Sequence, residues 1–271
     1  MSANGTLLCA ENRRPKMISS LLCLLALACW PVYGQIQQTP GKTILAVGAH
    51  AGDMEVTAGA LLAAQSRAGD RIVLLHLTLG EGGNPRLSTE QYAKQKRQEA
   101  GAAAEAIRAE VIFGPYKDGE LPNNEEARRY VAGIIRRIKP AYVLTHWKSG
   151  LHRDHIATHA IVTDAVLLAS LPNAPQGETP HRGVRSVWFT ENWEDKENFN
   201  PYICVDVSKG VDDWEKGATQ YEFIRGGISK FPYLEYYKAL FKVRGAESGV
   251  DLAECFDVES WRKKQIYRSL P

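Results

Sequence analysis

Two short clusters of histidine and carboxylate side chains are the most chemically informative features of the sequence. The first runs from Ala49 to Glu55 and reads AHAGDME; the second runs from His152 to His155 and reads HRDH. Imidazole nitrogens and carboxylate oxygens are ligands of catalytic zinc sites, which keep one coordination position open for water. A histidine and an aspartate three residues apart in a tight loop can face one point, and a histidine from the other cluster would complete a three-ligand site.

Both clusters lie where an apparent strand gives way to an apparent helix. Residues 44–49 form a short apolar run that leads into the first cluster, and residues 142–145 form another shortly before the second. In open α/β sheets, ligands bind beyond the carboxyl ends of the strands. The sequence therefore predicts that two distant segments meet at one edge of a sheet. A metal held there would lower the pKa of water from about 16 to near 7.

Alternating strand-like and helix-like segments surround the two clusters. The apolar run 71–79 is rich in β-branched residues, as expected for a strand buried on both faces. Helices are predicted over 56–68, 88–109, 124–138, 156–170, 208 to about 224, and 233–243, and further strands over 111–113, 142–145, 186–190 and 202–207. This order predicts a single Rossmann-like α/β domain whose mostly parallel sheet carries helices on both faces.

Alternative chemistries on this kind of fold lack their motifs here. Residues 48–53 read GAHAGD, without the Gly-x-Gly-x-x-Gly spacing of a dinucleotide site, and residues 79–83 lack the Lys-Ser/Thr of a P-loop. The Gly-x-Ser-x-Gly elbow that a serine hydrolase would need does not occur in the sequence. A nucleotide-binding oxidoreductase is therefore disfavoured, and it would be recognised by a copurifying cofactor without zinc.

The amino-terminal segment has the features of an export signal. Basic residues at 13, 14 and 16 precede the apolar run 18–30, and residues 32–34 offer a small-x-small cleavage pattern. We expect a signal peptide at 1–34, a linker at 35–43 and a periplasmic or extracellular protein after cleavage near Gly34. An N-terminal membrane anchor is the alternative, although the apolar run is shorter than the roughly 20 residues of a span. Without residues 1–34, 30 basic residues balance 30 acidic ones, so nothing indicates nucleic-acid binding.

The two clusters resemble motifs of the PIG-L/LmbE-like family of zinc-dependent N-deacetylases. Members of that family carry Ala/Pro-His-Pro-Asp-Asp with a nearby glutamate after the first strand, and His-x-Asp-His later in the chain. Supporting similarities lie at residues 77–81, 97–100, 118–119, 244–250 and 253–256. The resemblance therefore covers about residues 44–257, and it implies a deacetylase domain over residues 44–271.

The resemblance implies a role for each matching residue. His50, Asp53 and His155 take the positions of the metal ligands, with Zn²⁺ as the expected ion and another divalent metal such as Fe²⁺ as the alternative. His152 takes the position of the histidine that stabilises the oxyanion or protonates the leaving amine, and Asp154 that of the carboxylate that orients it. The implied reaction is hydrolysis of a linear amide, removing an N-acetyl group from a small-molecule sugar or sugar conjugate of the GlcNAc type.

One departure from the family pattern affects the catalytic step. Gly52 occupies the position of the first aspartate of the motif, which is the presumed general base. General acid–base help is typically worth about 100- to 10,000-fold in rate. Glu55, Asp154 or His152 could act as base instead, or the zinc-bound hydroxide alone could act slowly. The alternative is a catalytically impaired homologue that holds metal and binds carbohydrate, and a Gly52→Asp substitution would test these cases.

Several polar residues have a structural interpretation beside the functional one. Asp53 could cap the helix that follows it, and Glu55 is more typical of a first-turn helix charge than of a base. His146 ends a predicted strand and could line the site, although a structural role is more typical of such a histidine. Cys204 and Cys255 could pair or remain free thiols. The sequence leaves the oligomeric state open.

Overall fold

A computed structural model describes the chain over residues 41–173 and 179–263. The predicted signal peptide at 1–34 and the linker up to residue 40 lie outside the described residues, so export and cleavage stay predictions. Within the described ranges, no helix is long and apolar enough to cross a membrane.

A seven-stranded mixed sheet lies at the centre of the structure, in the order β3-β2-β1-β4-β5-β7-β6. Five neighbouring strands are parallel: β3 (Glu110–Phe113), β2 (Arg71–His76), β1 (Thr43–Gly48), β4 (Tyr142–Thr145) and β5 (Ser186–Thr190). The antiparallel strand is β7 (Ala253–Val258), which pairs with β5 and with the edge strand β6 (Ile203–Asp206). The prediction of an α/β fold with a mostly parallel sheet is confirmed.

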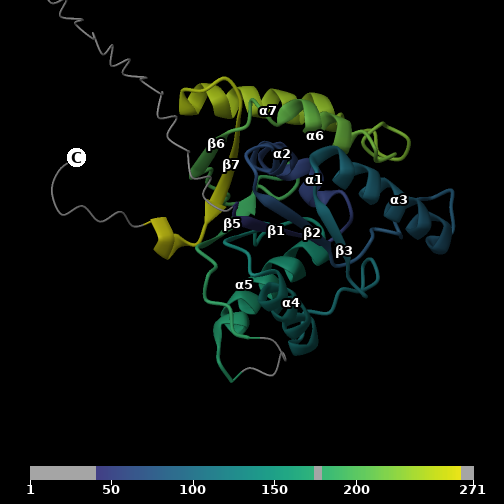
Figure 1. Cartoon of the computed structure of the whole chain (residues 1–271). Helices are drawn as coiled ribbons and strands as arrows, with labels where there is room; N and C mark the ends of the chain where they lie inside the picture. The colour runs from purple at the N-terminus through teal and green to yellow at the C-terminus, as the bar shows by residue number, and fades with distance from the viewer. Residues whose placement is uncertain (1–40, 174–178, 264–271) are drawn as a thin grey trace, which may run out of the picture. The chain divides into compact units, whose positions relative to one another are not determined.

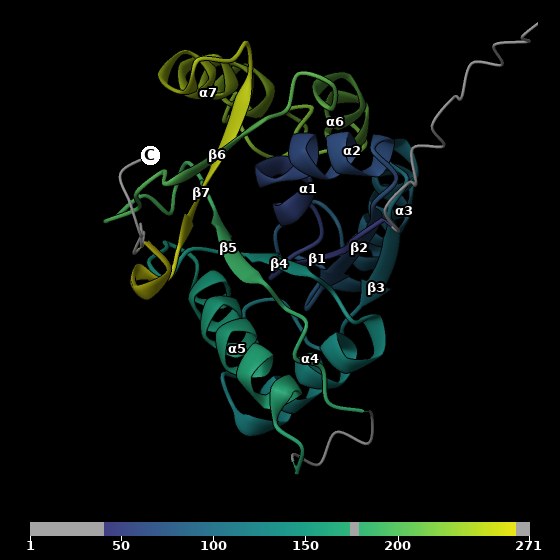
Figure 2. The ribbon, with the colours of Figure 1, turned by 60° about the vertical axis from the view of Figure 1, so that its left-hand side comes forward.

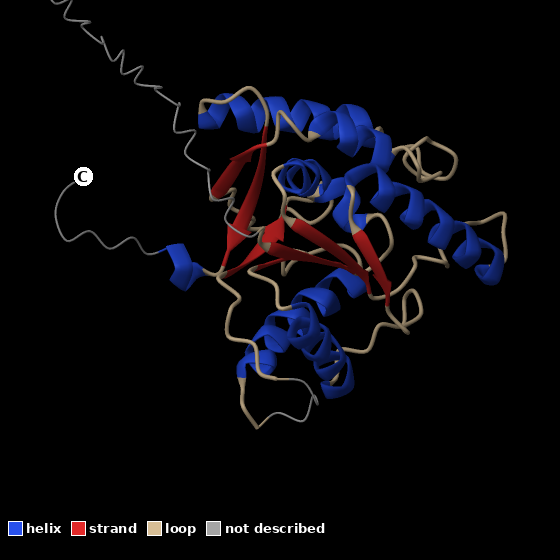
Figure 3. Ribbon diagram, in the orientation of Figure 1, coloured by secondary structure: helices blue, strands red, loops and turns tan. Residues whose placement is uncertain are grey.

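Helices cover both faces of the sheet (Figures 1 and 3). One face carries α4 (Glu125–Ile138) and α5 (Arg153–Ser170), which pack on each other and on β1. The opposite face carries α1 (Asp53–Thr57), α2 (Gly59–Arg67), α3 (Thr89–Ile107), α6 (Val211–Ala218) and α7 (Tyr233–Ser248), as the turned view of Figure 2 shows.

Alternate side chains of the central strands supply the two cores. In β1, Leu45 and Val47 join the apolar cluster formed with α4 and α5, whereas Ile44 and Ala46 join the cluster on the opposite face. Successive side chains of a strand point to opposite faces, which is why a continuous apolar run is needed here. The rigid, doubly covered strands fix the positions of the loops at their carboxyl ends.

A single buried carboxylate accounts for two differences from the predicted elements. The helix predicted over 56–68 is broken at Ala58 into α1 and α2, and the strand β7 was not predicted. Glu254 of β7 accepts hydrogen bonds from the backbone N–H groups of Ala60 (3.3 Å) and Leu61 (2.7 Å). These N–H groups have no partner within a helix that starts at Gly59. The polar side chain of Glu254, which interrupts the apolar residues of β7, is therefore the group that stabilises the start of α2.

The helix predicted from residue 208 to about 224 is shorter in the structure. It begins at Val211 and ends at Ala218, and turns follow it. The Arg225 guanidinium donates to the backbone oxygens of Thr219 and Gln220. Basic side chains often satisfy free carbonyl groups at a helix end, so this contact stabilises the earlier end.

The two cysteines of the predicted mature chain form a disulfide. Cys204 of β6 lies directly opposite Cys255 of β7, with the Cα atoms 4.1 Å apart. The bond closes a chain segment with a sequence separation of 51 residues. The alternative left open by the sequence is thereby resolved in favour of the pair.

Reduction of this disulfide is expected to lower the free energy of unfolding by about 2–4 kcal/mol, because the closed loop restricts the unfolded chain. Urea unfolding with and without reductant measures the difference. A Cys204→Ser/Cys255→Ser variant serves as control, since its unfolding midpoint should not respond to reductant. An unchanged midpoint of the unmodified protein would contradict the expectation.

Candidate functional site

The first predicted cluster forms the turn between β1 and α1. Gly52 adopts a φ of +109° at the start of α1, a backbone conformation that residues with a Cβ rarely adopt. The turn lets the backbone N–H of His50 donate to Oδ2 of Asp53 at 2.7 Å. The Asp53 carboxylate therefore folds back over the end of β1, on the same side as the His50 ring.

The second predicted cluster forms the start of α5. His152 is the N-cap residue of this helix, and its Nδ1 accepts the backbone N–H of Asp154 at 3.2 Å. Burial, together with the neighbouring rings of His50 and His155, lowers the pKa of His152. A neutral ring whose Nδ1 accepts a hydrogen bond carries its proton on Nε2. His152 is thus set to donate a hydrogen bond from Nε2.

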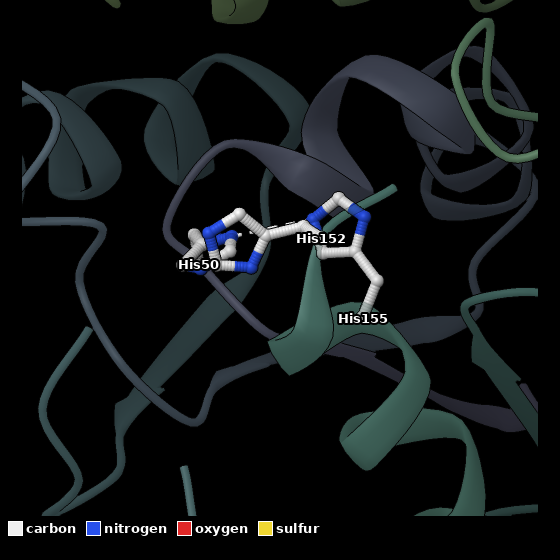
Figure 4. Close-up of side chains that lie close together, drawn as sticks. All are labelled: His50, His152 and His155. Carbon is white, nitrogen blue, oxygen red and sulfur yellow. Dashed lines mark hydrogen bonds between the residues drawn. The ribbon is translucent and has the colours of Figure 1, made fainter. Parts of the chain in front are cut away.

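The structure brings the three predicted metal ligands together. Nδ1 of His50 lies 3.3 Å from Oδ2 of Asp53 and 3.3 Å from Nε2 of His155. The Asp53 and His155 atoms are 3.6 Å apart. The His152 ring lies against His50, with ring centroids 4.5 Å apart (Figure 4). His50, His152 and His155 form one group whose nitrogen atoms could hold a metal ion.

Two carboxylates that sequence reasoning did not assign hold the ligand histidines in place. Oδ1 of Asp118 lies 3.1 Å from Nε2 of His50, and Oδ2 of Asp195 lies 2.9 Å from Nδ1 of His155. The other nitrogen of each ring, Nδ1 of His50 and Nε2 of His155, faces Oδ2 of Asp53. Asp195 follows β5, 40 residues from His155 in the sequence, so no local motif signals it. Asp118 lies in an Asp-Gly pair that the family resemblance includes.

The charged groups of the site shift one another's pKa values. Burial alone would lower the pKa of His50, but Asp53 and Asp118 raise it well above its ordinary value. Burial would raise the pKa of Asp53, yet His50 and His155 bring it well below the ordinary value. The Asp53 carboxylate is therefore ionised at neutral pH, as a metal ligand must be.

His146 at the end of β4 is part of the same cluster. Its ring stacks on His155, with centroids 4.1 Å apart. With Asp53 and His155 it forms a second group that could hold a metal. However, Nε2 of His146 accepts the backbone N–H of Ala49 at 3.0 Å, and burial together with His155 lowers its pKa to about 4. Because the Nε2 lone pair of His146 already accepts this hydrogen bond, His50 is favoured over His146 as the third ligand.

The two predicted catalytic carboxylates, Glu55 and Asp154, differ in their position relative to the cluster. Glu55 is 2% exposed and points away from the cluster, where Oε1 contacts the Tyr221 hydroxyl (2.5 Å) and Nε2 of His76 (3.2 Å). The Asp154 carboxylate accepts the backbone N–H of Gly119 at 2.7 Å, and its Oδ2 lies 3.6 Å from Nε2 of His50. The hydrogen bond from Asp154 to His152 comes from its backbone N–H. Glu55 is therefore not brought to the site, whereas the Asp154 carboxylate lies in the cluster beside His50, and its role toward His152 stays a prediction.

A cavity of about 210 Å³ opens above the convergent donors. The described residues that line it come from the strand-end loops, the first turns of α1 and α5, helix α3 and the segment between α6 and α7. They include His50, Asp53, His152, His155, Asp118, Lys96, Glu194 and Phe223. A larger cavity, of about 300 Å³, lies between α5 and the chain after β7 and has His181 as its only histidine among described residues. The chemistry of the side chains, not the volume, identifies the first as the candidate site.

Lys96 of α3 is the cation of this cavity. It is 3% exposed, its Nζ donates to the backbone oxygen of Ala51 at 2.5 Å, and its ammonium lies over the rings of Tyr221 and Phe223. Burial lowers its pKa, although Asp53 and other carboxylates oppose that effect. The contact with Ala51 ties the turn between β1 and α1 to α3.

These features define a class of protein: an α/β protein with a histidine–aspartate metal-type centre at the carboxyl ends of its parallel strands. The model of the PIG-L family, described as GlcNAc-PI de-N-acetylase, matches residues 45–166. The chain therefore carries a PIG-L family domain over these residues, and the resemblance inferred from its motifs is confirmed.

Individual relatives differ in the reactions for which they are named. A 4-oxalmesaconate hydratase of Pseudomonas putida is 24% identical over 218 residues, which cover 78% of this chain and 82% of that protein. A 1D-myo-inositol 2-acetamido-2-deoxy-alpha-D-glucopyranoside deacetylase of Geodermatophilus obscurus is 29% identical over 164 residues, or 49% of this chain. The chain spans 53–60% of the length of the curated deacetylases it matches.

Solved structures share the fold. A conserved protein of Thermus thermophilus is 28% identical and superposes with a TM-score of 0.71 over 80% of this chain and 94% of that one. The structural similarity therefore extends beyond the segment that the family model matches.

Proposed function

We propose that the protein is a zinc-dependent hydrolase that removes an N-acetyl group from a sugar or sugar conjugate. The observation that carries the proposal is the convergence of His50, Asp53 and His155 at the mouth of a cavity. The PIG-L family domain and relatives named as acetamido-sugar deacetylases support the reaction class.

The donor atoms fit a tetrahedral metal ion. Ligands about 2.0–2.1 Å from zinc in tetrahedral geometry are about 3.3–3.4 Å from each other, close to the 3.3, 3.3 and 3.6 Å that separate the donors of His50, Asp53 and His155. Carboxylates on the outer nitrogens of ligand histidines are typical of metal sites, and Asp118 and Asp195 take that place. A bound metal would supply a Lewis acid and water activation at neutral pH.

The protein's own residues supply orientation and hydrogen bonds. Asp118 and Asp195 fix the rings of His50 and His155, so that one nitrogen of each faces the cavity. The neutral His152 ring lines the same cavity and can donate from Nε2 to the oxygen of an acetamide carbonyl as negative charge develops there. The Lys96 contact with Ala51 keeps the turn that carries Asp53 in place.

Acetate release tests the proposal. Protein loaded with one equivalent of Zn²⁺ is incubated with N-acetylglucosamine, N,N'-diacetylchitobiose and a GlcNAc–inositol conjugate, and chelated protein is the control. We expect equal amounts of acetate and free amine, lost on chelation and regained on adding zinc. Calorimetric binding of these sugars without acetate release would indicate instead the catalytically impaired carbohydrate-binding homologue. The absence of both sugar binding and acetate release would contradict the proposal.

Hydration of an unsaturated acid is a second candidate function. It is favoured by the buried Lys96 ammonium in the cavity wall, which can pair with a substrate carboxylate, and by the relative named as a hydratase. Both reactions use activated water at the same centre. Zinc-dependent loss of ultraviolet absorbance of an unsaturated oxo acid, without acetate release from N-acetyl sugars, would favour hydration.

A further inference from the structure

The proposed hydrolysis needs a proton acceptor, and Gly52 has no side chain to provide one. Of the described residues, three carboxylates line the cavity: Asp53, Asp118 and Glu194. Asp53 is held by the backbone N–H of His50 and faces its ring, and Asp118 is held by the N–H of Gly82 at 2.9 Å and by His50. Both acids are committed to the metal-type cluster, which leaves Glu194.

Glu194 lies in the loop after β5, which is fixed on both sides of it. The ring of Trp193 stacks on Phe231, with centroids 4.0 Å apart. On the other side, Asp195 contacts Nδ1 of His155 at 2.9 Å. The loop is therefore anchored to the predicted ligand His155 and to the segment before α7. The loop thus keeps Glu194 at the site through its neighbours, and the anchoring contacts are made by Trp193 and Asp195.

Glu194 lines two cavities beside the predicted ligands, one of which Gly52 also lines. It lines the cavity of about 210 Å³ together with His152. It also lines the adjoining cavity of about 50 Å³, together with Gly52 and Asp53. Phe223 lines both cavities as well. A water molecule or substrate in the larger cavity would therefore have both His152 and Glu194 in the walls around it.

The surroundings of Glu194 favour proton uptake. Burial raises the pKa of its carboxyl group, the negative charges of Asp195 and Asp53 add to that effect, and the His155 ring and the Asn192 amide oppose it. A base is most effective when its pKa lies near the working pH. Glu194 is thus a better acceptor than a carboxylate held by ion pairs, such as Asp53.

We propose that Glu194 is the general base of this site, in place of the carboxylate that Gly52 lacks. The inference rests on the proposed hydrolysis. Glu194 takes a proton from the attacking water as the oxygen–carbon bond to the acetamide carbonyl forms. It returns that proton to the amide nitrogen as the carbon–nitrogen bond breaks. Acetic acid and a free amine leave, and the acid releases its proton to the solvent as acetate. Glu194 ends in its starting protonation state, and His152 donates to the oxyanion throughout.

Glu194→Gln tests the assignment, with Glu197→Gln as the matched control. Glu197 is an exposed residue of the same loop whose carboxylate contacts Ser149. We expect kcat of Glu194→Gln to fall about 100-fold or more with unchanged zinc content and KM, and Glu197→Gln to keep full activity. Formate should restore part of the rate of Glu194→Ala.

A second readout does not depend on turnover. Carbon-13 NMR of glutamate-labelled protein follows the carboxyl titrations, and the signal missing from Glu194→Gln identifies Glu194. We expect its midpoint above the ordinary value of about 4.3. A Glu194→Gln variant within threefold of the unmodified kcat would overturn the assignment and leave the proposed hydrolysis intact. Absence of acetate release from the unmodified protein would overturn both, because the base then has no reaction to serve.

Discussion

Replacing Asp53 with alanine is expected to prevent stoichiometric zinc binding and to lower acetate release by about 1000-fold or more, because the several kcal/mol that a metal contributes to the transition state are lost. Asp53 is the one anionic member of the three predicted ligands, and its Oδ2 atom faces both His50 and His155. Metal analysis after gel filtration measures the zinc content, and an acetate assay measures the rate.

Asp70→Ala provides the matched control for this loss. Asp70 is also a buried aspartate that accepts a backbone N–H, from Lys42, but it lies at the opposite end of the sheet, directly before β2. Its removal should leave zinc content and rate unchanged, whatever it does to stability. An Asp53→Ala protein that retains one zinc per chain would show that the ion is held by other members of the cluster.

Replacing Gly52 with alanine is expected to lower the free energy of unfolding by about 2–4 kcal/mol, from the combined cost of an unfavourable φ and an overpacked contact. Its φ is +109°, and a Cβ at this position would lie 2.9 Å from two ring atoms of Phe223. Urea denaturation of the two proteins gives the difference.

Gly69→Ala separates the two costs. Gly69 also has a positive φ, +95°, but a Cβ there would have no neighbour within 4 Å. It should therefore show the backbone cost alone, of order 1 kcal/mol. If Gly52→Ala and Gly69→Ala destabilise equally, Phe223 moves aside without cost. If Gly52→Ala lowers the free energy of unfolding more than Gly69→Ala does, as expected, the ring of Phe223 occupies the space that a side chain at position 52 would need.

This packing changes the meaning of a Gly52→Asp experiment. On the sequence alone, that substitution would supply the carboxylate that the family motif has at this position. In the structure, the new side chain would meet Phe223 and an unfavourable backbone angle, so an inactive Gly52→Asp protein would not show that a carboxylate is unhelpful there. Substitutions at Glu194 avoid this difficulty, because Glu194 is not among the residues with a positive φ.

The sequence was sufficient for the parts of the site that lie beside strand ends. The positions of His50, Asp53 and His155 follow from motifs next to β1 and β4, and parallel strands bring such ends to one edge. The remaining parts depend on contacts between distant segments. Glu55 is drawn from the site by Tyr221, 166 residues away, and Asp195 reaches His155 only once β5 is placed beside β4.

The residues of the site come from two different parts of the chain, and this division bears on how related proteins can differ. The proposed ligands and His152 all lie within residues 45–166, the part that the family model matches. Glu194 and Phe223, which face the same cavities, come from loops beyond that segment. Substitutions in these later loops could therefore change the proposed acceptor and the shape of the cavity without changing the proposed ligands themselves.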